Sequence, residues 1–389
     1  MNKLKKNGKI LIANDSVGYT GVQVTVGNLT SVLEEKGYEV VVMQTTDREF
    51  LKIKVPIEEQ FTWALFATPI VTERILIEKP DAILITTVEA SIGKATKDVC
   101  EFLETSKICT QCPYTLMYTT NHGIGAYKNL HNVVLGKGSD KNRKINDIEK
   151  KIIYSVEERF IQNKFSGAKR VLVNAQSSKE KLEDIGIDNI SVIPRGIDLG
   201  KFHLPNKNDT NPYLNYDWYI NDPKPILLYL GRVAFEKDIH IFLEGQYPNY
   251  HRVVAGPGVA LNSLKRKYGK DKNIHFTGPI SRDDVPNFFM FSRLSFFPSS
   301  FDTFGITIIE SAACGTPVVG FDVPGPKDVI KQDVMGIVVP KEKNIFDGLD
   351  KALKIDRKKC SEYTRENYSW EKSTEGLLNN LYQINWTRI

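Results

Sequence analysis

Cysteine is scarce in this chain: five cysteines are scattered among 389 residues. An odd and dispersed set does not form the framework of a disulfide-rich secreted domain. The one close pair, Cys109 and Cys112, has no second Cys or His pair at the spacing of a zinc site. We therefore expect a reduced, cytoplasmic protein without a structural metal.

Long hydrophobic runs are missing as well. No stretch of the sequence approaches the roughly 18 apolar residues that a membrane span requires. The N-terminal sequence MNKLKKNGKI also lacks the apolar middle region of a secretory signal. These absences favour an intracellular protein, and the lysines of this N-terminal stretch leave a peripheral contact with an anionic membrane open.

The charge balance shows only a small excess of one sign. The formal net charge is +5 at pH 7, and 25% of the residues are charged. A mildly basic chain suits a phosphorylated ligand or an anionic surface. The excess is too small to indicate nucleic-acid binding by itself.

The length predicts more than one domain. A chain of 389 residues exceeds what one hydrophobic core usually organises, and an apolar content of 41% is typical of globular proteins. We expect an N-terminal domain over 1–204 and a linker rich in Asn, Asp, Pro and Tyr over 205–224. A C-terminal domain over 225–368 and an amphipathic helix over 369–389 follow.

Apolar strands alternate with helices in both halves of the chain. The strand expected at 9–13 runs into a turn with Gly18 and Gly21 and then into an amphipathic helix, which makes one β-α-β unit. The same alternation continues, so the pattern predicts an α/β protein with doubly wound parallel sheets. Such sheets bind ligands outside the carboxyl ends of their strands.

Polar residues follow two of the predicted strands. His122 comes after the strand expected at 114–119, where its side chain would project into the ligand crevice. Arg232 and Lys237 follow the strand expected at 225–230, so both cations could converge on one diphosphate.

The stretch 299–330 predicts a strand, a glycine turn, a helix and another strand. A helix that begins where a parallel strand ends offers N–H groups and a positive dipole end to a phosphate. Asp302 and Gly305 precede this helix, and Thr307 with Glu310 has the pattern of a capping box. Because carboxylates accept hydrogen bonds, Asp302 could hold sugar hydroxyls and Glu310 a ribose diol. The arrangement suits a nucleotide sugar.

The spacing Asp302-x7-Glu310 followed by ACGTPVV, and the GR-x4-K of Arg232 and Lys237, carry a resemblance over most of the chain. They resemble the E-x7-E signature and diphosphate clamp of retaining glycosyltransferases with the GT-B fold (group 1, family 4-like). Asp302 stands where many members have Glu. The resemblance implies two Rossmann-like domains facing a cleft, with a last helix that crosses back to the first domain.

The resemblance also implies roles for single residues. His122 and Asp302 are the candidate catalytic residues, with His122 orienting the transferred sugar. The candidate donor-binding residues are Gly21, Arg232, Lys237, Phe304, Gly305, Ile306, Thr307 and Glu310. The sequence has no Asp-x-Asp pair that could hold a metal. Cations and the helix N-terminus would then neutralise the leaving diphosphate, and no metal cofactor is expected.

The implied activity is transfer of a hexose-type sugar, with retention, from a UDP- or GDP-sugar to a hydroxyl acceptor. A glycan or glycolipid is the default acceptor, and the basic segment 137–151 would also suit a modified base in DNA. An epimerase or phosphorylase shares this architecture, but the two motifs together argue against both. A non-catalytic nucleotide-sugar-binding subunit is the alternative of another class.

Overall fold

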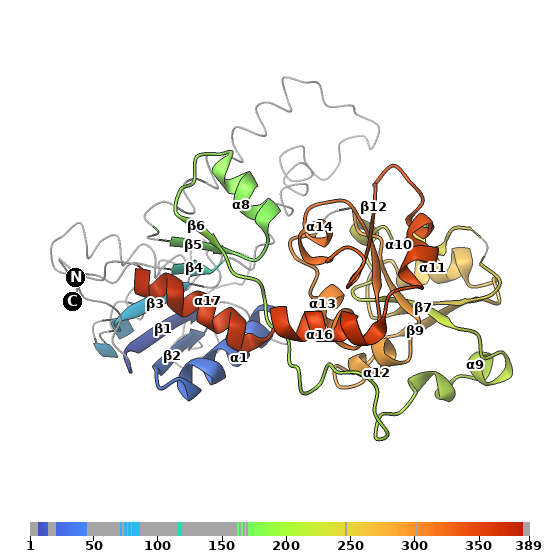
Figure 1. Ribbon diagram of the computed structural model, residues 1–389, viewed down its shortest axis with the longest axis horizontal. Coiled ribbons are helices and arrows are strands. Elements are labelled where there is room, and N and C mark those ends of the chain that lie inside the picture. The colour runs from blue at the N-terminus through green and yellow to red at the C-terminus, as the bar shows by residue number, and fades with distance from the viewer. Residues whose placement is uncertain are drawn as a thin grey trace, which may run out of the picture. The chain divides into compact units, whose positions relative to one another are not determined.

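The chain folds as two compact units, Met1–Pro194 with Trp370–Ile389, and Arg195–Ser369. The structure is a computed structural model, and it describes residues 7–14, 21–44, 71, 74–75, 77–78, 80–85, 116–118, 162, 165, 168, 170–245, 247–300 and 302–383. Each unit contains a parallel sheet with helices (Figure 1).

The described strands of the first unit form one six-stranded sheet in the order β2-β1-β3-β4-β5-β6. Every pairing is parallel. Residues 10–13 of β1, an interior strand, are fully buried, because helices cover both faces of a sheet of this kind. The strands are β1 (Lys9–Asn14), β2 (Glu39–Gln44), β3 (Ala82–Ile85), β4 (Leu116–Tyr118), β5 (Arg170–Val173) and β6 (Ile190–Val192).

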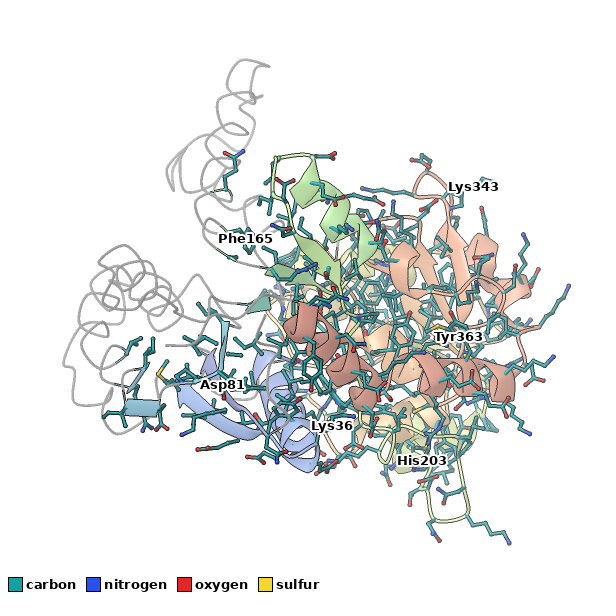
Figure 2. The ribbon with its side chains drawn as sticks, turned by 60° about the vertical axis from the view of Figure 1, so that its left-hand side comes forward. Lys36, Asp81, Phe165, His203, Lys343 and Tyr363 are labelled. Atoms are coloured by element: carbon teal, nitrogen blue, oxygen red, sulfur yellow. The ribbon has the colours of Figure 1, made fainter. Side chains whose placement is uncertain are left out.

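Backbone and side chain both anchor the start of this sheet. Asp81 lies just before β3 (Figure 2), and its carboxylate accepts a hydrogen bond from the Lys9 N–H at 2.8 Å. The Lys9 ammonium lies 2.9 Å from Glu78. These contacts connect the N-terminal end of β1 with the residues that precede β3.

The last helix of the chain belongs to the first unit. Helix α17 (Trp370–Gln383) packs along α1 (Gly21–Glu35) (Figure 1), and Leu377 and Leu381 enter the core beside Leu29 and Leu33. The apolar stripe of an amphipathic helix explains this burial. The first unit also contains helix α8 (Gln176–Glu183).

The second unit also has six described strands, in the order β12-β11-β10-β7-β8-β9, and all pairings are parallel. The order reverses between β7 and β10, which makes this pair of neighbours the topological switch point. The strands are β7 (Ile226–Leu230), β8 (His251–Ala255), β9 (Ile274–Gly278), β10 (Leu294–Phe297), β11 (Val318–Phe321) and β12 (Gly336–Val339).

Short helices lie between these strands and flank them in the chain. They are α9 (Asp217–Asn221), α10 (Ile239–Leu243), α11 (Leu261–Tyr268), α12 (Val285–Met290), α13 (Ile306–Ala313), α14 (Pro326–Val329), α15 (Leu349–Ala352) and α16 (Arg357–Asn367). Three 3-10 turns, Pro212–Asn215, Phe235–Lys237 and Ile345–Gly348, precede α9, α10 and α15. Residues 345–352 thus form a 3-10 turn followed directly by one short α-helix. No described helix has the length and apolarity to cross a membrane.

The segment 205–224, expected as a linker, lies inside the second unit. Tyr213 is fully buried, and its hydroxyl donates to the Phe288 carbonyl at 3.1 Å. Trp218 stacks on His275, with 3.8 Å between the ring centres and 9° between the planes. Composition indicated irregular structure here, but the buried aromatic rings attach the segment to the sheet unit.

Candidate functional site

The residues predicted to bind phosphate and sugar come directly after the two strands of the switch point, β7 and β10. Arg232 and Lys237 come after β7, and Asp302 comes after β10, which pairs with β7. Because parallel strands end at the same edge of a sheet, these loops meet there.

Lys237 and Asp302 form the direct link between the two loops. The Lys237 Nζ lies 2.6 Å from Asp302 Oδ2, and the two side chains are 22% and 17% exposed. The other oxygen of Asp302 accepts hydrogen bonds from the N–H groups of Thr303 at 2.8 Å and Phe304 at 3.3 Å. The carboxylate is therefore held in one orientation, and the cation lies next to it.

A second contact fastens the same two loops. Asp238, which follows Lys237, has the left-handed backbone conformation with φ of 51°. Its carboxylate accepts a hydrogen bond from the Ser300 N–H at 3.1 Å. This bond fixes the distance between the end of the 3-10 turn and the chain that leads to Asp302.

Arg232 pairs with a carboxylate of its own loop. Its guanidinium lies 2.6 Å from Glu236, and both side chains are more than half exposed. Its backbone is held by the buried Tyr229, whose hydroxyl donates to the Arg232 carbonyl at 2.8 Å. An exposed ion pair contributes only about 0–1 kcal/mol, so an anionic ligand can compete with Glu236 for the guanidinium.

The glycines of the segment GPG after β8 have a packing reason. A Cβ atom on Gly256 would lie 2.1 Å from the backbone oxygen of Gly231. The loops after β7 and β8 are also joined by a bond from the Val233 N–H to the Pro257 carbonyl at 2.7 Å. Only a residue without a side chain allows this approach, and it supports the backbone next to Arg232.

Helix α13 begins two residues earlier than the capping-box pattern indicates. Gly305 is its N-cap in the left-handed conformation, with φ of 83° and no side-chain cap. Thr307 is thus in the first turn and Glu310 in the second, so the capping-box interpretation of this pair is wrong. The first-turn N–H groups, including those of Ile306 and Thr307, have no intrahelical partner, and they follow directly after Asp302 and the buried Phe304.

Glu310 is buried at 0% exposure and bound by Arg282, whose guanidinium donates to Glu310 Oε1. Burial raises the pKa of Glu310, and the charges of Arg282 and Arg195 oppose this effect. The second carboxylate oxygen, Oε2, has no hydrogen-bond partner among the described residues. The Arg282 guanidinium also lies 5.4 Å from the centre of the Phe202 ring.

Sequence reasoning missed Arg282, Arg195 and Tyr229. Arg282 lies in the polar turn SRDD after β9, and its only signal was its place at the carboxyl end of a strand. Gly21 is the first residue of α1 in the first unit. His122 lies outside the described residues. Among the residues that are described, no three His, Cys, Asp or Glu side chains form a metal-binding cluster.

The two doubly wound α/β units define the GT-B class of folds, and solved structures support this assignment. Sucrose-phosphate synthase from Thermosynechococcus elongatus matches with a TM-score of 0.73 over 97% of this chain and 98% of that chain, at 17% identity. Anabaena HepE in complex with UDP-glucose matches with a TM-score of 0.65 over 97% and 100%, at 14% identity.

Residues 217–368 match the family model of the glycosyl transferases group 1. This match covers most of the second unit, and the family resemblance and the fold expected from the sequence are confirmed.

Curated relatives share shorter stretches. An uncharacterized glycosyltransferase of Methanocaldococcus jannaschii is 27% identical over 55% of this chain. The alpha-monoglucosyldiacylglycerol synthase of Streptococcus pneumoniae is 29% identical over 48%. The alpha-D-kanosaminyltransferase of Streptomyces kanamyceticus is 33% identical over 31%. The matches span 60%, 44% and 33% of these relatives' own lengths.

Proposed function

We propose that this protein is a retaining, metal-independent glycosyltransferase that moves a hexose-type sugar from a UDP- or GDP-sugar to a hydroxyl acceptor. The observation that carries the proposal is the Lys237–Asp302 pair, 2.6 Å apart at the switch point and directly ahead of α13. A cation for phosphate, a carboxylate for hydroxyls and a helix N-terminus together suit a nucleotide sugar.

The diphosphate of the donor would lie at the cations and the start of α13. Lys237 supplies a compact charge, and Arg232 can exchange its exposed pairing with Glu236 for a bidentate contact with phosphate. The N–H groups of Gly305, Ile306 and Thr307 would donate to the same oxygens. Charge that develops on the leaving diphosphate is then stabilised by groups already in place.

The sugar and the ribose would be held by carboxylates. Asp302, oriented by two backbone N–H groups, would accept hydrogen bonds from sugar hydroxyls. Glu310 would accept from the ribose diol. Glu310 is fully buried, and the half-exposed Arg282 is bound to it. The ribose could therefore reach this carboxylate only after the Arg282 side chain moves away.

The reaction would retain the anomeric configuration by a front-side route. The bond between the anomeric carbon and the leaving phosphate oxygen breaks, and the acceptor oxygen attacks on the same face. The proton of the acceptor hydroxyl passes to an oxygen of the departing diphosphate. His122 is proposed to orient the transferred sugar, and Gly21 to lie against the donor.

A glycolipid or glycan is the proposed acceptor. It is supported by the name of one relative, the alpha-monoglucosyldiacylglycerol synthase of Streptococcus pneumoniae. The two alternatives are a modified base in DNA as the acceptor and a non-catalytic protein that only binds nucleotide sugars. The experiment below distinguishes both from the proposal.

The test begins with a thermal-shift screen of UDP-glucose, UDP-galactose, UDP-N-acetylglucosamine and GDP-mannose. The best donor is then incubated with glycan, diacylglycerol and hydroxymethylated-DNA acceptors, and product is followed by mass spectrometry. We expect transfer by the wild type, loss in Asp302→Asn, and retention in the surface control Lys341→Ala. Donor binding without transfer or hydrolysis would support the non-catalytic role, and no shift with any donor would overturn the proposal.

A further inference from the structure

We propose that α11 and the two loops beside it form a face that attaches the second unit to an anionic lipid surface. This attachment face consists of the exposed apolar residues Phe235 and Val259 and the exposed cations of 265–272. It does not depend on the proposed transfer reaction, because none of these residues is assigned to the donor.

The apolar end of the attachment face is unusually open. Phe235 is 67% exposed and Val259 is 82% exposed. They lie in the loops after β7 and β8, which backbone hydrogen bonds hold together, including one from the Ala260 N–H to the Val233 carbonyl at 3.0 Å. Two large apolar side chains are thus presented to solvent on a rigid support.

The basic end is the second half of α11 and the turn after it. The exposed cations there are Lys265, Arg266, Lys267, Lys270 and Lys272. Two carboxylates lie nearby: Asp271, 3.3 Å from the buried Arg252, and Glu244, which accepts from the neutral Tyr268 hydroxyl at 3.4 Å. Five exposed cations outnumber them. The excess of positive charge therefore faces outward.

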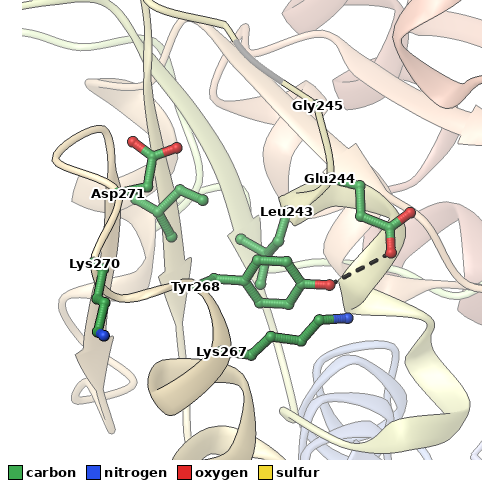
Figure 3. A pocket seen from close by; sticks show the side chains of 8 residues that line it. Leu243, Glu244, Gly245, Lys267, Tyr268, Lys270 and Asp271 are labelled. Atoms are coloured by element: carbon green, nitrogen blue, oxygen red, sulfur yellow. Dashed lines mark hydrogen bonds between the residues drawn. The ribbon is translucent and has the colours of Figure 1, made fainter.

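Two hollows connect Phe235 at the apolar end with Lys267 and Lys270 at the basic end. A cavity of about 240 Å³ is lined by Phe235, Ala260, Lys267 and Tyr268, among others. A second cavity of about 390 Å³ shares Lys267 and Tyr268 and extends to Lys270. Figure 3 shows the second cavity, with the Lys267 side chain running beside the Tyr268 ring and the Tyr268 hydroxyl directed to Glu244.

This combination fits a lipid surface better than a purely charged partner. Exposed apolar side chains next to a row of cations are the features of peripheral membrane contacts, in which the apolar groups enter the interface and the cations meet anionic headgroups. Lysine stems can also cover apolar surface while their ammonium groups stay in water. Charge complementarity thus favours anionic lipid headgroups, such as phosphatidylglycerol, as the partner.

Vesicle co-sedimentation of the full chain tests the proposal. We expect binding to phosphatidylcholine vesicles that contain phosphatidylglycerol, weaker binding as salt rises, and little binding to phosphatidylcholine alone. The variant Lys265→Glu/Arg266→Glu/Lys267→Glu should bind more than roughly 100-fold more weakly, because each lost cation costs about a factor of five and each new carboxylate is repelled by anionic headgroups. Phe235→Ser/Val259→Ser should weaken binding about tenfold through lost apolar burial.

The control reverses the same number of exposed lysines elsewhere on the second unit, in Lys351→Glu/Lys354→Glu/Lys359→Glu. It should bind as the wild type does, and unchanged melting temperatures would show that all variants are folded. Equal weakening of the control and the α11 variant would overturn the proposal. So would failure of the wild type to sediment, or binding to a short RNA without binding to anionic vesicles.

Discussion

Lys237 and Arg232 differ in their surroundings, although both are proposed to bind the diphosphate. Lys237 is mostly covered and paired with Asp302, whereas Arg232 is largely exposed and paired with Glu236. A ligand that binds Lys237 must therefore share it with the Asp302 carboxylate, whereas the Arg232 side chain can leave its exposed partner Glu236 to reach a ligand. Both arrangements allow a charge-assisted contact with phosphate.

We predict that Arg232→Ala and Lys237→Ala each weaken donor binding by about 1.5–3 kcal/mol, the range for hydrogen bonds to charged groups. Isothermal calorimetry with the donor found in the screen measures this, with Lys341→Ala as a control on the same unit. Unchanged affinity in both variants would mean that the diphosphate lies elsewhere.

Glu310 forms a buried pair with Arg282, and this pair has a pH signature. Burial raises the Glu310 pKa, and Arg282 counteracts the rise, so removing Arg282 should raise that pKa further. When the pKa of a carboxyl group is higher in the folded than in the unfolded protein, the free energy of unfolding decreases as the pH rises from the unfolded pKa to the folded pKa. We predict that Arg282→Met melts at a lower temperature as the pH increases above the ordinary Glu range.

The double variant Arg282→Met/Glu310→Gln separates this effect from a packing defect. Its melting temperature should lose the added pH slope, because the titrating group is absent. The single variant Glu310→Gln should keep a melting temperature near that of the wild type while it stops distinguishing ribo- from 2′,3′-dideoxyribonucleotide donors. A pH slope that persists in the double variant would assign the effect to another residue.

At the scale of elements, the contact between α9 and β9 contains a half-buried histidine. His251 Nε2 donates to the Asp222 carbonyl at 2.6 Å, so its Nδ1 accepts from His275 Nε2 at 3.0 Å. Trp218 of α9 covers the His275 ring. Burial, with a smaller effect of His251, lowers the pKa of His275 to about 4.

The unfolded chain therefore binds a proton near pH 6.5 that the folded chain binds only near pH 4. We predict that the free energy of unfolding decreases as the pH is lowered from about 6.5 to about 4, by up to about 3 kcal/mol. His275→Phe keeps a ring against Trp218 and should flatten this dependence, whereas the exposed-site control His240→Gln should not. Denaturant unfolding at several pH values decides between them.

The loops after β7 and β8 depend on the absence of a side chain at Gly256. A Cβ there would meet the Gly231 oxygen at 2.1 Å, whereas a Cβ on Gly278, at φ of 73°, would meet no atom within 4 Å. We predict that Gly278→Ala costs only the backbone strain of about 1–3 kcal/mol. Gly256→Ala should cost clearly more, because backbone must also shift. Equal destabilisation in chemical unfolding would contradict the close approach seen here.

At the scale of the whole molecule, the proposed chemistry depends on fixed cations and a helix terminus instead of a metal. We predict that transferase activity persists in excess EDTA, because these groups neutralise the leaving diphosphate. The assay compares initial rates before and after chelation and after addition of Mg²⁺ or Mn²⁺. Complete loss that a divalent cation restores would reveal a metal requirement.

The sequence by itself predicted the α/β class, the family resemblance and the sheet edge at which Lys237 and Asp302 meet. These features follow from local signals: apolar runs form strands, glycines form turns, and the residues after neighbouring parallel strands share an edge. The role proposed for His122 stays a prediction, as do the donor-binding roles.

Only the tertiary structure decided the partners of these residues. Arg282 and Glu310 are 28 positions apart, and Lys237 and Asp302 are 65 apart, so no local pattern pairs them. The start of α13 at Gly305, in place of a capping box, depends on a backbone conformation that the pattern of Thr307 and Glu310 does not report. The packing of 205–224 on the second unit has the same cause, since burial of Tyr213 requires a pocket built by α12.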